Sequence, residues 1–129
     1  MNKGIEIRDA HFPGRAPIDA YGNGGFRFAD MSHRGSIFCL PSGIYGWEPK
    51  TPPLLGVGDI DRIIAEADQI EILLVGTGTD LRRLPEDLRA VLREYSISAD
   101  PMSTGAAVRT YNVLLAEERA VAAVLIAVD

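Results

Sequence analysis

The chain has 129 residues and a formal net charge of −5, with 47% hydrophobic and 24% charged residues. This composition is typical of a folded globular protein and excludes disorder as the default interpretation. The length suits a single domain spanning residues 1–129. The acidic balance argues against nucleic acid as a partner, because binding to phosphates generally needs a basic face.

Cysteine content and hydropathy indicate the cellular compartment that we expect for the protein. Cys39 is the only cysteine, so the chain can form neither an internal disulfide nor a site with several thiolates. Charges interrupt the apolar residues of segment 1–10, which is therefore not expected to be a signal peptide. The longest nearly apolar run, 120–128, is too short to cross a bilayer. We expect a cytoplasmic protein without direct membrane insertion, and attachment to the periphery of a membrane complex stays open.

The first half of the chain is predicted to consist of strands and loops. Alternation of apolar and charged residues over 5–8 favours a short strand, and prolines and glycines between 13 and 25 favour a loop. Two further strands are expected at 26–28 and 35–40, paired as an antiparallel hairpin that extends the main sheet. Segment 42–53 has several glycines and prolines and the only tryptophan, and is predicted to be a loop with an aromatic anchor.

The second half alternates between helix and strand. Asp59 is a candidate N-cap of a helix whose apolar face comprises Ile60, Ile63, Ile64 and Ala67. A buried strand is predicted over 71–75. Pro85 suits the first turn of the next helix, whose expected inward face comprises Leu88, Val91, Leu92 and Tyr95.

The last third is predicted to add a strand, a helix and a strand. The strand at 97–99 should end before Pro101, and Ser103 or Thr104 can cap a helix that runs to about residue 117. Segment 120–128 is expected to be a buried interior strand close to 71–75. Together the elements predict an α/β fold: a single three-layer domain around a mixed, mostly parallel sheet of about five strands, one of them antiparallel.

The two loops at 76–78 and 103–105 are the strongest candidate for a binding site. Both follow predicted parallel strands, so both should emerge at the carboxyl edge of the sheet, where open α/β sheets bind ligands. Small residues at a helix start also leave backbone N–H groups available to an anion or a partner. The candidate ligand- or partner-binding residues are Gly76, Thr77, Gly78, Arg82, Ser103, Thr104, Gly105, Arg109 and Asn112.

The residues of these two loops also have structural explanations that require no binding site. The first loop, Gly-Thr-Gly-Thr-Asp, lacks the third glycine of a dinucleotide fingerprint, and its glycines also suit an ordinary turn. The second loop also suits a simple helix cap. Tyr21, Tyr45 and Trp47 form either an exposed patch for a partner or a plug at the end of the core.

No catalytic residue, cofactor or metal site is predicted. His11 and His33 have no ligating side chains at suitable spacing, and Cys39 lies in an apolar strand where a thiol is usually inert. Ser42 lacks a nucleophile elbow. Asp80, Glu86 and Asp87 bracket a helix start, whose dipole they complement.

Two segments carry a family resemblance. Residues 70–84 (IEILLVGTGTDLRRL) and 103–128 (STGAAVRTYNVLLAEERAVAAVLIAV) resemble the Mth-type domain family of unknown function, as do the glycines around Phe26 and the segment from Gly35 to Trp47. That family includes a mitochondrial assembly factor of respiratory complex I and an adipogenesis-associated domain protein. Val108 stands where many members carry a cysteine, so no thiol chemistry is implied there.

The resemblance implies a three-layer α/β domain and no established reaction. It implies a non-enzymatic binding or assembly role that acts through protein partners, among them a membrane complex under assembly. The alternative is a small-molecule or anion-binding protein, with or without catalytic activity, that uses a crevice between loops 76–78 and 103–105.

Overall fold

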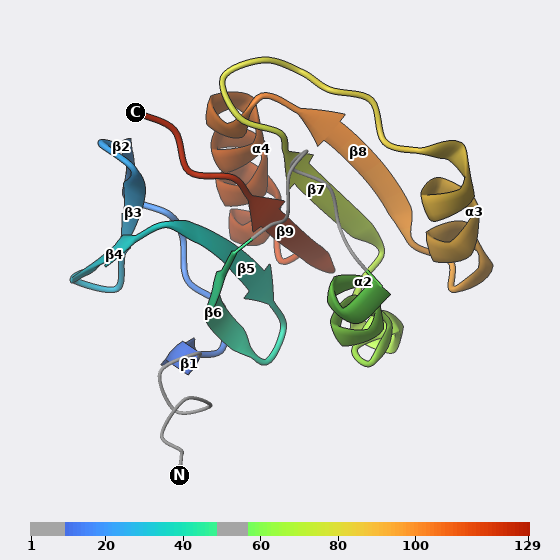
Figure 1. Ribbon diagram of the computed structural model, residues 1–129. Helices are drawn as coiled ribbons and strands as arrows, with labels where there is room; N and C mark the ends of the chain where they lie inside the picture. The colour runs from blue at the N-terminus through green and yellow to red at the C-terminus, as the bar shows by residue number, and fades with distance from the viewer. Residues whose placement is uncertain (1–9, 49–56) are drawn as a thin grey trace, which may run out of the picture.

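A six-stranded mixed sheet forms the centre of the molecule (Figure 1). The computed structural model describes residues 10–48 and 57–129. The strand order is β1-β6-β5-β9-β7-β8, with β1 at Ala10–Pro13, β5 at Ser36–Leu40, β6 at Gly43–Trp47, β7 at Ile72–Gly76, β8 at Ser98–Met102 and β9 at Val121–Leu125. Strand β7 pairs in parallel with β8 and β9, whereas the β1–β6, β5–β6 and β5–β9 pairs are antiparallel. The α/β class and the mixed sheet are confirmed, but the described sheet is larger and more antiparallel than expected.

The two interior strands predicted from apolar runs are confirmed. Strands β7 and β9 are parallel neighbours within the sheet, and every residue of β9 is buried. Leu73 belongs to the core on one face of the sheet and Leu74 to the core on the other. A continuous apolar run results because both faces of these strands are covered.

Three layers enclose these cores. Helices α2 (Val57–Ile64) and α3 (Glu86–Glu94), with the short helix η1 (Ala67–Gln69) between them in the chain, contribute to the core on one face. Helix α4 (Thr104–Ala116) covers the other face together with a second, three-stranded sheet. Among the described helices, none is both long enough and apolar enough to span a bilayer.

The second sheet comprises β2 (Ala20–Gly22), β3 (Gly25–Phe28) and β4 (Met31–Arg34), and it lies to the left of the main sheet in Figure 1. The expected hairpin between 26–28 and 35–40 is therefore wrong, and so is the extension of the main sheet by both strands: β3 pairs with β2 and β4 instead. Two-residue turns with positive φ connect these strands, at Asn23-Gly24 (53° and 79°) and Ala29-Asp30 (50° and 62°). The second turn lacks the glycine that usually announces such a reversal.

Segment 42–53 was predicted to be a loop, yet residues 43–47 form β6 between β1 and β5. Glycine is needed at Gly43 because a side chain there would collide with the carbonyl of Phe12 in β1. The same glycines that favoured a loop thus allow strands to approach closely. The predicted strand at 5–8 lies outside the described residues.

Two boundary predictions and one burial prediction are also corrected. Helix α2 begins at Val57, so Asp59 lies in its first turn and does not cap it. Strand β8 runs through Pro101 at the edge of the main sheet, where a missing N–H donor is tolerated. Helix α3 buries Leu88 and Leu92 only; the other two expected inward residues, Val91 and Tyr95, are exposed.

Candidate functional site

The carboxyl ends of β7 and β8 bring the two predicted loops into direct contact. The N–H of Thr77 donates to the carbonyl of Met102 (2.8 Å), and the N–H of Thr104 donates to the carbonyl of Gly78 (2.8 Å). The N–H of Gly78 in turn donates to Oγ1 of Thr104 (3.0 Å). Loops 76–78 and 103–105 therefore face one another, but hydrogen bonds occupy the space between Gly78 and Thr104. A ligand would therefore bind on the outer surface of the two loops and not between them.

Thr104 is the buried centre of this edge. Its hydroxyl donates to the carbonyl of Ile126 (2.7 Å) while it accepts from Gly78, so one side chain joins three segments of the chain. A side chain at Gly76 would press against Leu125 (3.0 Å) and the Cα of Thr104 (3.1 Å). Ser103 is the N-cap of α4 and accepts from the N–H of Ala106 (3.4 Å). The small residues noted in the sequence are thus used for close packing.

Beyond the contact, residues 79–83 form an exposed stretch that we call the rim loop. Thr77, which is buried, holds its start: the Thr77 hydroxyl donates to the carbonyl of Asp80 (2.7 Å) and accepts from the N–H of Arg82 (3.0 Å). Leu81 lies between these two anchored residues with 63% of its surface exposed. The rim loop therefore holds an apolar side chain in solvent on a hydrogen-bonded backbone.

The two candidate residues in α4 differ in their surroundings. Arg109 is exposed, and the ion pairs of the described residues do not include it. The Asn112 side chain is engaged by the backbone of Ile18, which precedes β2. Arg109 is therefore available to a partner or ligand, whereas the amide of Asn112 is already used within the protein.

The aromatic residues that the sequence left ambiguous fall into two groups. Trp47 is buried and stacks on Phe38, with ring centroids 5.1 Å apart, and the half-buried Tyr45 lies beneath the Arg62 guanidinium, 4.7 Å from its ring centroid. Tyr21 is 42% exposed and lies against the start of α4, where a side chain at Gly105 would collide with its hydroxyl. Trp47 and Tyr45 pack in or against the core, and Tyr21 brings the small sheet to the candidate site.

A hollow on the small sheet was missed by the sequence analysis. It has a volume of about 440 Å³, and residues from all three strands line it, among them Arg27, Ser32 and Arg34. The signal that could have found it is the alternation around the Asn-Gly turn, because a hairpin places every second residue on one face.

The remaining chemical candidates have structural partners or are buried. The Ser42 hydroxyl donates to the carboxylate of Glu66 (2.6 Å) and lies 2.5 Å from the hydroxyl of Tyr45, which anchors the β5–β6 turn to the segment after α2. Burial raises the pKa of the Cys39 thiol far above its usual range, so the nucleophilic thiolate is not formed at neutral pH. Within the ranges that the structure describes, no three His, Cys, Asp or Glu side chains are grouped to hold a metal ion.

Similar proteins match nearly the whole chain. An uncharacterized protein of Rhodobacter capsulatus is 40% identical over 119 residues, which cover 92% of this chain and 90% of that protein. A crystal structure described as an outer membrane protein from Bartonella henselae is 70% identical and superimposes with a TM-score of 0.88, covering 92% of this chain and 100% of the other. A Bordetella pertussis solution structure described as a Mth938-like domain has a TM-score of 0.74 at 24% identity, a likeness of fold alone.

More distant relatives have a described role. The NADH dehydrogenase [ubiquinone] 1 alpha subcomplex assembly factor 3 of Xenopus tropicalis is 28% identical over 109 residues, which cover 84% of this chain but 60% of that protein. The family model for the "Protein of unknown function (DUF498/DUF598)" matches residues 18–126. This match includes the small sheet, helices α2 to α4 and every strand of the main sheet except β1, and so the chain is a member of the DUF498/DUF598 family.

Proposed function

We propose that this chain is a protein-binding domain that assists the assembly of a membrane-bound complex and contacts its partner through the rim loop. The observation that carries the proposal is Leu81, an apolar side chain with 63% exposure between two hydrogen-bonded anchor points. Single exposed apolar residues are common on protein surfaces. Leu81 differs because its backbone is already ordered, so burial against a partner costs little conformational entropy.

Charge at the rim loop adds specificity to this contact. Arg82 and Arg83 are exposed directly after Leu81. Arginines around an apolar anchor are frequent at protein interfaces, because guanidinium groups pair with carboxylates in a defined geometry. We infer that the partner presents an apolar pocket with acidic residues at its border.

The residues expected from the sequence divide into two roles under this proposal. Arg82 and Arg109 are exposed and would contact the partner. The other candidate residues hold the structure of this edge of the sheet. The loops are held by Gly76, Thr77, Gly78, Ser103 and Thr104. Gly105 leaves space for the Tyr21 side chain, and Asn112 binds the backbone of Ile18. This role requires no catalytic residue, since the site would recognise and hold a partner.

The class of partner is suggested by the relatives named as assembly factors of NADH dehydrogenase. We propose that the partners are subunits or assembly proteins of a respiratory NADH dehydrogenase, which this chain binds on the cytoplasmic side of the membrane. Because this chain spans 60% of the Xenopus factor, contacts made by the remainder of that protein are not transferred.

The test is a deletion of the gene in its source organism, with assembled NADH dehydrogenase measured by native gel electrophoresis. We expect subcomplexes to accumulate, and expect wild-type protein but not Leu81→Asp to restore full assembly. Tyr95→Asp is the matched control, because Tyr95 is also exposed (47%) but lies at the end of α3, away from the rim loop. Normal assembly in the deletion strain, or equal rescue by both variants, would contradict the proposal.

An anionic small molecule between loops 76–78 and 103–105 was the alternative. The direct hydrogen bonds between Gly78 and Thr104 fill the space that such a ligand would need. A partner surface that lies over the rim loop does not need this space. Arg109→Ala tests this residue under either idea, since it should weaken binding of a partner or a ligand without unfolding the protein, as arginine and alanine both favour helix.

A further inference from the structure

The outer face of the small sheet has an unusual combination of side chains. Cross-strand pairing places Arg27 opposite Ser32 and Ala20, and Arg34 opposite Gly25, which in turn is opposite Gly22. Residues that pair directly, and those two apart along a strand, share one face. The opposite face carries Phe26 and Phe28, which are buried against the main sheet. The outward residues are thus two arginines above four small residues: Ala20, Gly22, Gly25 and Ser32.

These small residues produce the hollow. Its volume of about 440 Å³ lies within the range of sites for small molecules. At Gly25, a methyl group would collide with the carbonyl of His33 and lie 3.2 Å from the Cα of Arg34. No other residue fits there without movement of β4. The floor of the hollow is therefore backbone and small side chains, which allow a ligand to approach the sheet closely.

The walls are positively charged. Arg27 and Arg34 are diagonal neighbours across β3 and β4, a spacing within the reach of long side chains, and both line the hollow. In the part of the chain that the structure describes, the ion pairs are Glu86–Arg93 and Glu71–Arg119, so neither wall arginine is neutralised by a carboxylate. Two guanidinium groups outside these ion pairs at one hollow contrast with the net charge of −5 of the whole chain.

We propose that this hollow binds a small molecule that carries a phosphate monoester. A monoester has a charge of about −1.5 to −2 at neutral pH, which matches two guanidinium groups, whereas a carboxylate matches one. Arginine presents paired N–H donors to phosphate oxygens, and the Ser32 hydroxyl adds a donor from the floor. Asn23 at the border provides a contact for the organic part of the ligand. The site is separate from the rim loop and does not depend on its proposed function.

The test is a nuclear magnetic resonance titration of the isotope-labelled full chain with phenyl phosphate and, separately, inorganic phosphate. We expect saturable shifts of the backbone amides of Gly25, Arg27, Ser32 and Arg34. The double variant Arg27→Gln/Arg34→Gln should weaken binding roughly tenfold or more, because it removes both charge-assisted contacts. Tighter binding of phenyl phosphate than of inorganic phosphate would identify an organic monoester as the ligand class. Tighter binding of inorganic phosphate would contradict it.

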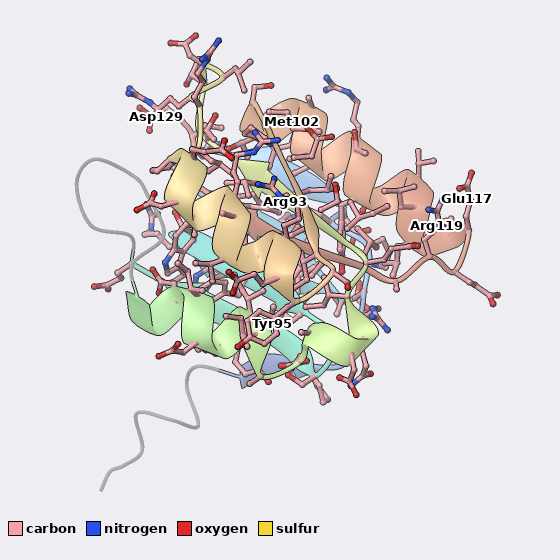
Figure 2. All side chains as sticks on the ribbon, turned by 90° about the vertical axis from the view of Figure 1, so that its right-hand side faces the viewer. Arg93, Tyr95, Met102, Glu117, Arg119 and Asp129 are labelled. Atoms are coloured by element: carbon pink, nitrogen blue, oxygen red, sulfur yellow. The ribbon has the colours of Figure 1, made fainter. Side chains whose placement is uncertain are left out.

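A matched control removes the same charge elsewhere. Arg93 and Arg119 lie on α3 and after α4, with exposed side chains (Figure 2). Arg93→Gln/Arg119→Gln should bind phenyl phosphate as the wild type does. If Arg27→Gln/Arg34→Gln loses its folded spectrum, Arg27→Lys/Arg34→Lys replaces it; this variant keeps both charges and should bind more weakly, because lysine lacks the paired donors.

Three results would overturn the proposal. The first is an absence of saturable shifts up to about 10 mM ligand, the weakest binding that such a site would show. The second is equal weakening by the two charge-removing double variants, which would indicate a general effect of net charge. The third is saturable binding of a glutamate-rich peptide but of neither phosphate, which would identify the hollow as a docking site for an acidic protein segment.

Discussion

Both polar groups of the Asn112 side chain bind the backbone of Ile18. The Asn112 carbonyl oxygen accepts from the N–H of Ile18 (2.9 Å), and the Asn112 amide donates to the Ile18 carbonyl (2.8 Å). Ile18 is buried and leads into β2, the first strand of the small sheet. One side chain of α4 therefore imitates a strand neighbour and fastens the small sheet to the rest of the protein.

This contact predicts a large effect of Asn112→Ala. The change leaves a donor and an acceptor of Ile18 unpaired, so the free energy of unfolding should fall by about 2–4 kcal/mol. Urea denaturation followed by circular dichroism measures it. Asn112→Asp is a matched comparison: it keeps the acceptor but places a carboxylate oxygen against the Ile18 carbonyl, so it should also destabilise the protein at neutral pH. A loss below ~0.5 kcal/mol for Asn112→Ala would show that water replaces both bonds.

Leu73 tests the central position of β7. Its side chain is fully buried in the core under α2 and α3. Leu73→Ala removes apolar contacts and leaves a cavity, so it should lower the free energy of unfolding by about 2–5 kcal/mol in urea denaturation. A change of less than ~1 kcal/mol is incompatible with this position.

Tyr111 should tolerate the loss of its hydroxyl. The side chain is fully buried beneath the main sheet, and its hydroxyl has no hydrogen-bond partner among the described residues. Burial is also the main reason that the pKa of Tyr111 lies far above its usual range. Tyr111→Phe keeps the ring and removes an unsatisfied polar group, so thermal unfolding should show unchanged or higher stability, by up to about 1 kcal/mol. A marked loss of stability would reveal a partner for the hydroxyl.

The Ala29-Asp30 turn should be improved by glycine. Both residues have positive φ, a conformation that costs non-glycine residues free energy. Asp30→Gly should raise the free energy of unfolding by about 0.5–1 kcal/mol, because glycine is strongly preferred in such a turn. Differential scanning calorimetry measures the shift. Asp61→Gly, at an exposed position inside α2, is the control and should destabilise the protein.

Long apolar runs made the centre of the fold predictable. Interior strands were correctly predicted within 71–75 and 120–128 because both of their faces are covered, which leaves no polar alternation, although β9 ends at Leu125. The cap at Ser103 was also predictable, since its chemistry is local.

The small sheet could not be predicted in the same way. Its strands have three or four residues, and the reversal at Ala29-Asp30 has no glycine, so local patterns did not separate β4 from β5. Likewise, Gly43 in the sequence alone indicates a loop. The structural need for glycine there is the close approach of the Phe12 carbonyl, which belongs to a distant segment of the chain. The hollow with Arg27 and Arg34 depends on this missed pairing and was missed with it.

For the candidate site, the sequence predicted which loops would meet but not how closely. Parallel strands bring loops 76–78 and 103–105 to one edge, which topology alone requires. The hydrogen bonds of the Thr77 and Thr104 side chains could not be predicted, because they depend on side-chain positions. Because of these bonds the two loops pack together where a crevice was expected, and Leu81 is exposed beyond them.

The most direct test of the rim loop is site-specific photo-crosslinking in the source organism. A photoreactive phenylalanine analogue replaces Leu81 in one strain and Tyr95, at the end of α3, in another, and mass spectrometry identifies the crosslinked proteins. We predict that position 81 captures subunits or assembly proteins of NADH dehydrogenase and that position 95 does not. Crosslinks to those proteins from position 95 alone, or none from position 81 while the protein supports normal assembly, would contradict the proposed role of the rim loop.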